Sequence, residues 1–188
     1  MFFVGSQGEG RKCTVDGIRR LCFNPCVETD AYIALGSNLG DRDLNLLKAV
    51  AEIGRLPSGK VTGLSPFYET SPVGVTDQPL FCNAVLRLAT GQPPLELLHS
   101  LQHIESEVFK RKRDRHWGPR TMDLDLLLYG DCVMDSVELT LPHPRLAERR
   151  FVLQPLCDLA PQLAHPRLGR TMVQLLAGLQ SAEKVTRI

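Results

Sequence analysis

The chain has 188 residues, 43% of them hydrophobic, and a formal net charge of +1 at pH 7. This length and composition predict one globular domain with a sizeable core, and the balanced charge argues against a general nucleic-acid or membrane binder. The start of the chain turns polar too soon for a secretory signal, and no apolar run approaches membrane length. We therefore expect a cytoplasmic protein.

Residues 1–28 differ in character from the rest of the chain. They are rich in Gly, Arg and Cys and show no sustained hydrophobic period, which predicts a disordered or loosely attached arm or a start site assigned too early. Residues 29–188 are expected to form the single domain. The six cysteines match no zinc-binding spacing and are expected to be reduced thiols: Cys13, Cys22, Cys26, Cys82, Cys132 and Cys157.

The domain begins with a short apolar strand, expected at residues 31–35, and a Gly-rich turn. Asp41 is a suitable N-cap for the helix that follows. The apolar spacing within this helix places Leu44, Leu47 and Ala51 on its buried side. The turn lacks the G-x-G-x-x-G spacing and so gives only weak support for phosphate binding.

Two strands are expected next, at residues 61–69 and 81–89, joined by a long polar loop with two prolines. A loop of this kind on a compact domain is often functional. In the second strand, Asn83 lies on the same face as Phe81. Its amide could bind a ligand beside an aromatic ring, and an asparagine satisfied within the strand is the alternative.

A helix is expected over residues 94–109, with a buried stripe formed by Leu97, Leu101, Ile104 and Val108. Gln102 and Glu105 are i, i+3 neighbours beside this stripe, close to the following loop. They would lie near a ligand held by that loop, or they are ordinary surface residues. His99 and His103 have metal-ligand spacing, but no third ligand is near, so an exposed helix face is favoured.

The helix leads into a dense basic loop from Lys110 to Arg120, in which six of eleven residues are Lys or Arg. Gly118-Pro119 breaks any helix and marks a loop that feeds the next strand. Lys and Arg in such a loop suit the oxygens of a polyphosphate. A solvated basic loop or a nucleic-acid contact is the alternative.

The following segment alternates polar and apolar side chains and predicts a strand closed by Gly130. Asp123 and Asp125 then share one face, about 7 Å apart along the strand. Two carboxylates so placed repel each other unless a cation lies between them, and Mg²⁺ with phosphate oxygens suits them. A strand edge with two solvated aspartates is the alternative. The opposite, core-facing side of the strand is expected to carry Leu124, Leu126 and Leu128.

The remaining pattern predicts a hairpin over residues 131–141, a helix that includes residues 149–158 and a final short helix over 171–179. Up to residue 129 the order of elements is β-α-β-β-α-β. This order predicts an α+β, ferredoxin-like fold, in which helices pack on an antiparallel sheet.

Four segments of the chain have a distinctive joint order. They are Leu35-Gly36-Ser37-Asn38-Leu39-Gly40, Asp77-Gln78-Pro79 with Asn83, the run from Arg115 to Asp125, and Leu141-Pro142-His143-Pro144-Arg145. Together they resemble the 6-hydroxymethyl-7,8-dihydropterin pyrophosphokinase family of folate biosynthesis. The resemblance covers the chain from about Ala31 onward, and its most specific part is Trp-Gly-Pro-Arg-Thr-x-Asp-x-Asp.

The resemblance implies transfer of pyrophosphate from ATP to the pterin hydroxymethyl group, with release of AMP and no covalent enzyme intermediate. It implies two Mg²⁺ ions held by Asp123 and Asp125, and a monomer is expected. A phosphotransferase that leaves ADP and a non-catalytic nucleotide- or RNA-binding ferredoxin-like module are the competing hypotheses. An RNA-binding module gains nothing from paired aspartates beside its basic loop.

The resemblance also assigns roles to individual residues. It implies catalytic roles for Lys110, Lys112, Arg120, Asp123 and Asp125. It implies ATP contacts for Gln102, Glu105, Trp117, Arg120, Leu126, Leu139, Thr140, His143 and Arg149, with Trp117 in a loop that closes over the site. It implies pterin contacts for Gly36, Thr70, Ser71, Val73, Phe81, Asn83 and Phe151, with the two phenylalanine rings on either side of the pterin.

Three positions depart from the family pattern. Lys110 and Lys112 stand where relatives often carry arginine, and lysine lacks the bidentate geometry of a guanidinium. Arg111 or Arg113 could take their place if the loop shifts by one residue. Ser71 stands where proline is common, which predicts a looser pterin loop.

Overall fold

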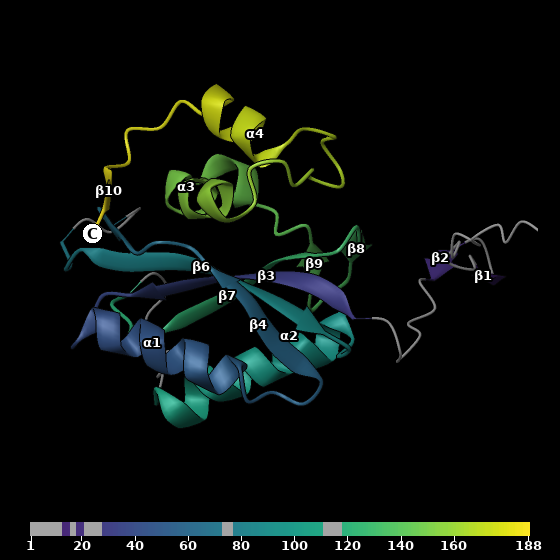
Figure 1. Cartoon of the computed structure of the whole chain (residues 1–188), viewed down its shortest axis with the longest axis horizontal. Helices are drawn as coiled ribbons and strands as arrows, with labels where there is room; N and C mark the ends of the chain where they lie inside the picture. Colours follow the sequence, from purple (N-terminus) through teal and green to yellow (C-terminus); the bar gives the residue numbers. More distant parts are fainter. Residues whose placement is uncertain (1–12, 16–17, 21–27, 73–76, 111–117) are drawn as a thin grey trace, which may run out of the picture.

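The computed structural model describes residues 13–15, 18–20, 28–72, 77–110 and 118–188. A six-stranded sheet with helices on both faces forms its main part (Figure 1). The helices α1 (Arg42–Ile53) and α2 (Pro94–His103) cover one face. The helices α3 (Arg150–Leu159) and α4 (Met172–Gly178) lie over the other. The α+β class is therefore confirmed.

The sheet consists of β3 (Thr29–Ser37), β4 (Gly59–Leu64), β5 (Tyr68–Thr70), β6 (Phe81–Thr90), β7 (Asp123–Tyr129) and β10 (Val185–Arg187). Its order is β10-β5-β6-β3-β7, with β4 also paired to β6. Every pair is antiparallel. β3, the first strand of the domain, thus lies between β6 and β7, and the ferredoxin-like expectation is confirmed.

The single strand expected at residues 61–69 is divided into β4 and β5, which occupy the same edge of β6. Pro66 lies between them and has no N–H to donate to a ladder. Ser65 bridges the interruption: its N–H donates to the Val85 carbonyl, and its Oγ accepts from the Val85 N–H, both at 2.9 Å. The division lets β5 continue along β6 toward the start of that strand.

α1 begins where the sequence indicated, because the Leu44 N–H donates to Asp41 Oδ1 at 3.0 Å. Its buried side was predicted wrongly. Leu44 and Leu47 are exposed, as is Ala51, and the helix packs on the sheet through Leu46, Ala49 and Ile53. Both sets of residues have helical spacing, so the spacing alone could not show which set is buried, and contact with the sheet determined it.

α2 confirms most of its expected stripe, with Leu97, Leu101 and Ile104 buried. The helix continues as a π-helical segment, Ile104–Val108. A π turn adds a residue to the helical repeat and rotates the side chains that follow. Val108 is consequently exposed rather than buried, which corrects the prediction for that residue.

The strand β7 contributes to two hydrophobic cores. Leu124 and Leu126 belong to the core under α1 and α2, as expected. Leu128 was expected beside them but belongs, with Leu127, to the core under α3 and α4. The pairing with β3 shifts by one residue at Leu127, and such a bulge moves the following side chains to the opposite face.

Smaller elements complete the fold. β8 (Met134–Asp135) and β9 (Thr140–Leu141) form the expected hairpin, and a 3₁₀ turn (Leu146–Glu148) precedes α3. β10, which pairs with β5, was not predicted. Within the first 28 residues, β1 (Cys13–Val15) and β2 (Ile18–Arg20) pair with each other, and the expectation of a disordered arm stays a prediction. In the described part of the chain, no helix has the length and apolarity that a membrane crossing requires.

Candidate active site

The two aspartates lie at the start of β7, an edge strand of the sheet. Asp123 pairs with Gly36 of β3, and Asp125 pairs with Ala34. Both carboxylates are partly exposed, whereas Leu124 between them is buried in the core. The predicted shared face for the two carboxylates is therefore confirmed.

Each carboxylate has an arginine near it. Arg120 Nη1 lies 2.6 Å from Asp123 Oδ2, and Arg149 Nη1 lies 3.9 Å from Asp125 Oδ2. The Asp123 and Asp125 side chains are 24% and 39% exposed, so both remain open to a ligand. Acids and guanidinium groups alternate across the site, and this pattern suits the oxygens of a polyphosphate with a bound cation.

The backbone of Arg120 is held by Asn38, which is 2% exposed. The Arg120 N–H donates to Asn38 Oδ1 at 2.7 Å, and the Asn38 N–H donates to the Arg120 carbonyl at 3.1 Å. Asn38 Nδ2 also donates to Gln78 Oε1 at 3.0 Å. Asn38 thus joins its own loop to the loops that contain Gln78 and Arg120. In the sequence Asn38 stands out only as part of a motif, although an amide with donors and an acceptor suits this task.

His143 lies next to the arginines with its backbone N–H bound to the Leu127 carbonyl at 2.8 Å. Burial, followed by the charges of Arg149 and Arg145, lowers the pKa of His143 to about 4. Its ring is therefore neutral at pH 7. Nδ1 accepts from the Arg145 N–H at 3.2 Å, so the ring proton is on Nε2, which makes Nε2 a neutral donor.

Arg149 precedes α3 and is 17% exposed. Burial is the main cause that lowers its pKa, with Arg145 second. An arginine keeps its charge in spite of such a shift. Its guanidinium lies 5.5 Å from the centroid of the Phe151 ring, a cation–π distance. Arg149, which the family pattern assigns to ATP, is therefore in contact with Phe151, which the same pattern assigns to the pterin.

Gly36 is the point at which the predicted pterin and metal residues meet. It pairs with Asn83 on one side and with Asp123 on the other. A Cβ at Gly36 would lie 2.9 Å from Asn83 Oδ1, 3.9 Å from Asp123 Cβ and 4.0 Å from Phe81 Cδ1. A side chain at Gly36 would have to displace the Asn83 amide. Asn83 is 6% exposed, and its Nδ2 donates to Thr70 Oγ1 at 2.7 Å.

Glu105 is not the surface residue that the alternative interpretation allowed. It is 4% exposed, and its Oε1 accepts from the Leu124 N–H at 2.7 Å. This bond fixes the start of β7 between the two aspartates. Gln102 is exposed on α2. The remaining residues predicted to contact adenosine lie on β7 and the neighbouring hairpin: Leu126 and Leu139 are buried in one core, and Thr140 is half-buried.

Several expected residues lie outside the described part of the chain: Val73, Lys112, Trp117 and the two alternatives Arg111 and Arg113. Lys110 is described. Its side chain is 76% exposed, and its Nζ lies 3.7 Å from Glu107. Ser71 is described as well: its N–H donates to the Lys184 carbonyl at 3.2 Å, and its Oγ accepts from the Lys184 N–H at 3.3 Å.

The comparisons with known proteins agree with this geometry. A family model described as 7,8-dihydro-6-hydroxymethylpterin-pyrophosphokinase (HPPK) matches residues 32–161. A protein of Pseudomonas aeruginosa named 2-amino-4-hydroxy-6-hydroxymethyldihydropteridine pyrophosphokinase is 47% identical over 146 residues, which are 78% of this chain and 89% of that protein. A Bacillus subtilis protein of the same name is 47% identical over 133 residues, 71% of this chain and 79% of the relative.

Solved structures are similar in fold. The crystal structure of Plasmodium falciparum wild-type HPPK-DHPS with pteroate superposes with a TM-score of 0.65 at 16% identity, over 80% of this chain and 42% of that chain. At this identity the likeness concerns the fold alone, and this chain spans less than half of the solved one. The match to the family model and the identity to the bacterial relatives show that the chain belongs to the 7,8-dihydro-6-hydroxymethylpterin-pyrophosphokinase family.

Proposed function

We propose that the chain transfers pyrophosphate from ATP to the hydroxymethyl group of 6-hydroxymethyl-7,8-dihydropterin in folate biosynthesis. The observation that carries this proposal is the contact at Gly36, which joins the Asn83 amide to the Asp123 carboxylate across one strand. A ligand read by Asn83 and a polyphosphate held near Asp123 would meet there.

The triphosphate of ATP would lie among Arg120, Arg149 and His143. The two guanidinium groups offer paired donors to phosphate oxygens. The neutral His143 ring offers its Nε2–H and adds no charge to the cluster. Lys110, Lys112 and Trp117 belong to the loop that would close over the nucleotide. Gln102 and Glu105, with Leu126, Leu139 and Thr140, complete the proposed ATP residues.

Asp123 and Asp125 would hold two Mg²⁺ ions. Their hard carboxylate oxygens fit this cation. Among the described residues, no group of three or more His, Cys, Asp or Glu side chains could hold a metal ion, so phosphate oxygens and water would complete the coordination. When bound, Mg²⁺ supplies neutralisation of phosphate charge.

The pterin would lie between the rings of Phe81 and Phe151. Its polar edge would face the Asn83 amide and the backbone of the loop that contains Thr70, Ser71 and Val73. The Asn83 amide is oriented by its bond to Thr70, so it can present a fixed edge to the ligand. Gly36 permits the pterin to approach both Asn83 and the phosphate-binding residues.

The reaction itself needs orientation and charge neutralisation more than a nucleophilic side chain. The hydroxymethyl oxygen forms a bond to the β-phosphorus of ATP and gives up its proton. The bond from this phosphorus to the oxygen that bridges to the α-phosphorus breaks, and AMP leaves with that bridging oxygen. Arg120 and Arg149 would stabilise the charge that develops on the phosphates.

A product assay tests the proposal. The protein is incubated with ATP, Mg²⁺ and the pterin, and the nucleotide product is identified. We expect AMP in equal amount with the pterin diphosphate. ADP would instead indicate transfer of a single phosphoryl group. A folded protein that binds ATP and releases neither product would favour the nucleotide- or RNA-binding module. We also propose that the enzyme acts as a cytoplasmic monomer, and sedimentation of the full chain tests its oligomeric state.

A further inference from the structure

The first turn of α3 has no cap from its own sequence. Arg149 occupies the N-cap position and makes no side-chain capping bond. The N–H groups of Arg150 and Phe151 donate instead to one oxygen, Oε2 of Glu183, at 2.8 and 3.2 Å. A carboxylate is well placed there because the free N–H groups and the helix dipole are positive at this end.

The residues that follow Glu183 bind the other side of the proposed pterin site. The Lys184 backbone exchanges two hydrogen bonds with Ser71, through the Ser71 N–H and its Oγ. Val185 pairs with Thr70 in the sheet. Thr70 Oγ1 in turn accepts from the Asn83 amide. Residues 183–185 thus connect the Phe151 side of the site with the Asn83 side.

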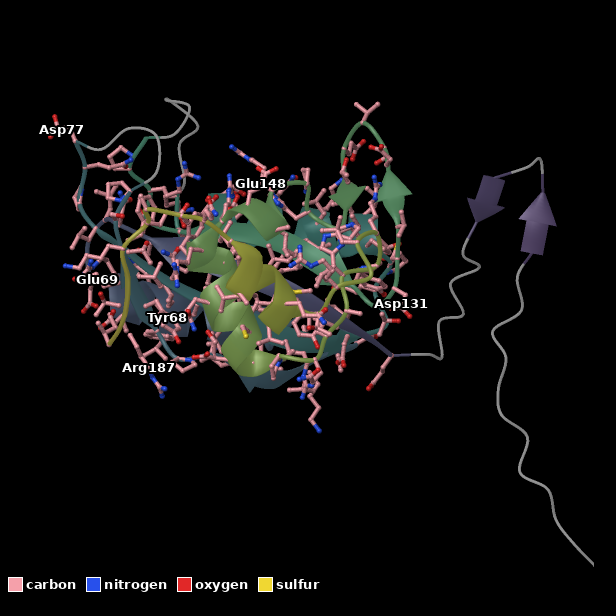
Figure 2. All side chains as sticks on the ribbon, turned by 90° about the horizontal axis from the view of Figure 1, so that it is seen from above. Tyr68, Glu69, Asp77, Asp131, Glu148 and Arg187 are labelled. Atoms are coloured by element: carbon pink, nitrogen blue, oxygen red, sulfur yellow. The ribbon has the colours of Figure 1, made fainter. Side chains whose placement is uncertain are left out.

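This connection lies at the edge of the sheet where the C-terminal chain returns from α4 (Figure 1). Tyr68 of β5 pairs with Arg187 of β10, and the two labelled side chains lie together in Figure 2. Burial lowers the pKa of Arg149, and the Glu183 carboxylate is among the charges that oppose this shift. Glu183 therefore influences both the backbone of the first turn and the guanidinium next to it.

We propose that residues 183–185 form a C-terminal clamp, in which Glu183 is a positioning residue that holds Phe151 and Arg149 opposite Asn83. The inference rests on the proposed pterin site. It also gives Ser71 a structural role: a proline at this position could not donate the N–H that the Lys184 carbonyl accepts. At this position the serine attaches the pterin loop to the clamp.

The test compares Glu183→Ala and Glu183→Gln with Thr171→Ala. Thr171 is the N-cap of α4, and its side chain accepts from the Gln174 N–H. α4 carries no proposed site residue. Glu183→Ala and Thr171→Ala should lower the melting temperature by similar amounts, and Glu183→Gln should lower it less. The affinity for the pterin substrate is then measured by titration in the presence of Mg²⁺ and a non-cleavable α,β-methylene analogue of ATP.

We expect Glu183→Ala to weaken pterin binding about five- to tenfold, an effect of the size that a lost cap produces. Glu183→Gln keeps an acceptor oxygen and should weaken binding less. Thr171→Ala should bind the pterin as the wild type does. In a Phe151→Ala background, Glu183→Ala should have a much smaller further effect, because the part of its effect that passes through that ring is already lost.

The clamp would be overturned by wild-type affinity in a folded Glu183→Ala variant or by equal weakening in Thr171→Ala. Full additivity of Glu183→Ala and Phe151→Ala would do the same. If Phe151→Ala alone binds the pterin normally, the proposed pterin site is wrong, and the clamp proposal is wrong as well. Ser71→Pro gives a second probe, for which we expect weaker pterin binding than for Ser71→Ala.

Discussion

The two sides of the candidate site are held by different kinds of contact. On one side, Asp123, Asp125 and Asn83 stand on strands whose positions follow from pairing with β3. On the other side, Arg149 and Phe151 begin a helix that is capped by Glu183, 32 residues beyond Phe151 in the chain. The sheet side is fixed by many ladder bonds, whereas the helix side depends on a few side chains from distant segments.

The sheet side is therefore the rigid part of the site, and the helix side is the part that can adapt. Neighbouring ladder bonds support one another, so the loss of one side chain leaves the carboxylates in place. The first turn of a helix lacks such support and is the part of a helix that opens most easily. We therefore expect the loss of a supporting side chain to displace the site residues more on the helix side than on the sheet side.

The largest effect is expected at the paired carboxylates. Asp123→Ala or Asp125→Ala should reduce turnover by about 10³-fold or more, because each removes a carboxylate that would hold Mg²⁺, the cation that neutralises phosphate charge. The fold should persist, since the ladder of β7 is unchanged. AMP release and circular dichroism measure the two results.

Asp131→Ala is the matched control, because Asp131 is exposed in the turn after β7 and lies far from Asp77 in Figure 2. Undiminished turnover in either active-site variant would remove the metal assignment.

A single methyl group on the sheet side should have the next largest effect. In Gly36→Ala, the new Cβ would lie 2.9 Å from Asn83 Oδ1. The displaced amide should lower kcat/KM for the pterin about 100-fold, as misplacements of about 1 Å can do. Steady-state kinetics with varied pterin measure this loss.

Gly63→Ala controls for the strain of such a clash. Its Cβ would lie 2.8 Å from Leu159 Cδ1, in a strand without proposed site residues. The comparison between the two sides of the site would fail if Gly63→Ala lowered kcat/KM as much as Gly36→Ala at equal stability.

Asn38 connects the sheet to the loops, so its replacement should have an intermediate effect. Asn38→Ala removes the acceptor of the Arg120 N–H and should lower kcat/KM about tenfold, with a loss of about 1–3 kcal/mol in unfolding free energy. Asn38→Asp keeps that acceptor but loses the donor to Gln78 and to the Pro79 carbonyl, and it adds a negative charge. Urea unfolding and kinetics of both variants separate the two bonds, and equal kinetic losses would argue against a special role for the Arg120 contact.

The last effect concerns stability at different pH values rather than activity, and it lies near the helix side. The pKa of His143 is lowered to about 4 in the folded protein, below the ordinary value of about 6.5 in the unfolded chain. Between these values the unfolded state binds the extra proton, so folding stability falls as pH falls from about 6.5 to 4. Relative to His143→Gln, the wild type should lose about 2 kcal/mol over this window. Urea midpoints at several pH values test this, and parallel curves for the two proteins would contradict it.

Local patterns of the sequence predicted much of this protein. The period of two in Asp123–Tyr129 defined a strand with both carboxylates on one face, and the Asp41 cap marked the start of α1. The order of strands and helices was enough for the ferredoxin-like fold. These features depend on neighbours within a few residues, so they can be inferred before any tertiary contact is known.

Tertiary structure decided what depends on contacts between distant segments. The bulge at Leu127 moved Leu128 to the second core, and packing on the sheet chose Leu46 over Leu47 in α1. Asn38 and Glu183 gained their tasks because folding brought unpaired N–H groups of other segments to them. A sequence determines which groups can donate and accept, but only the folded chain determines which of them meet, because each buried N–H binds whichever acceptor the packing leaves beside it.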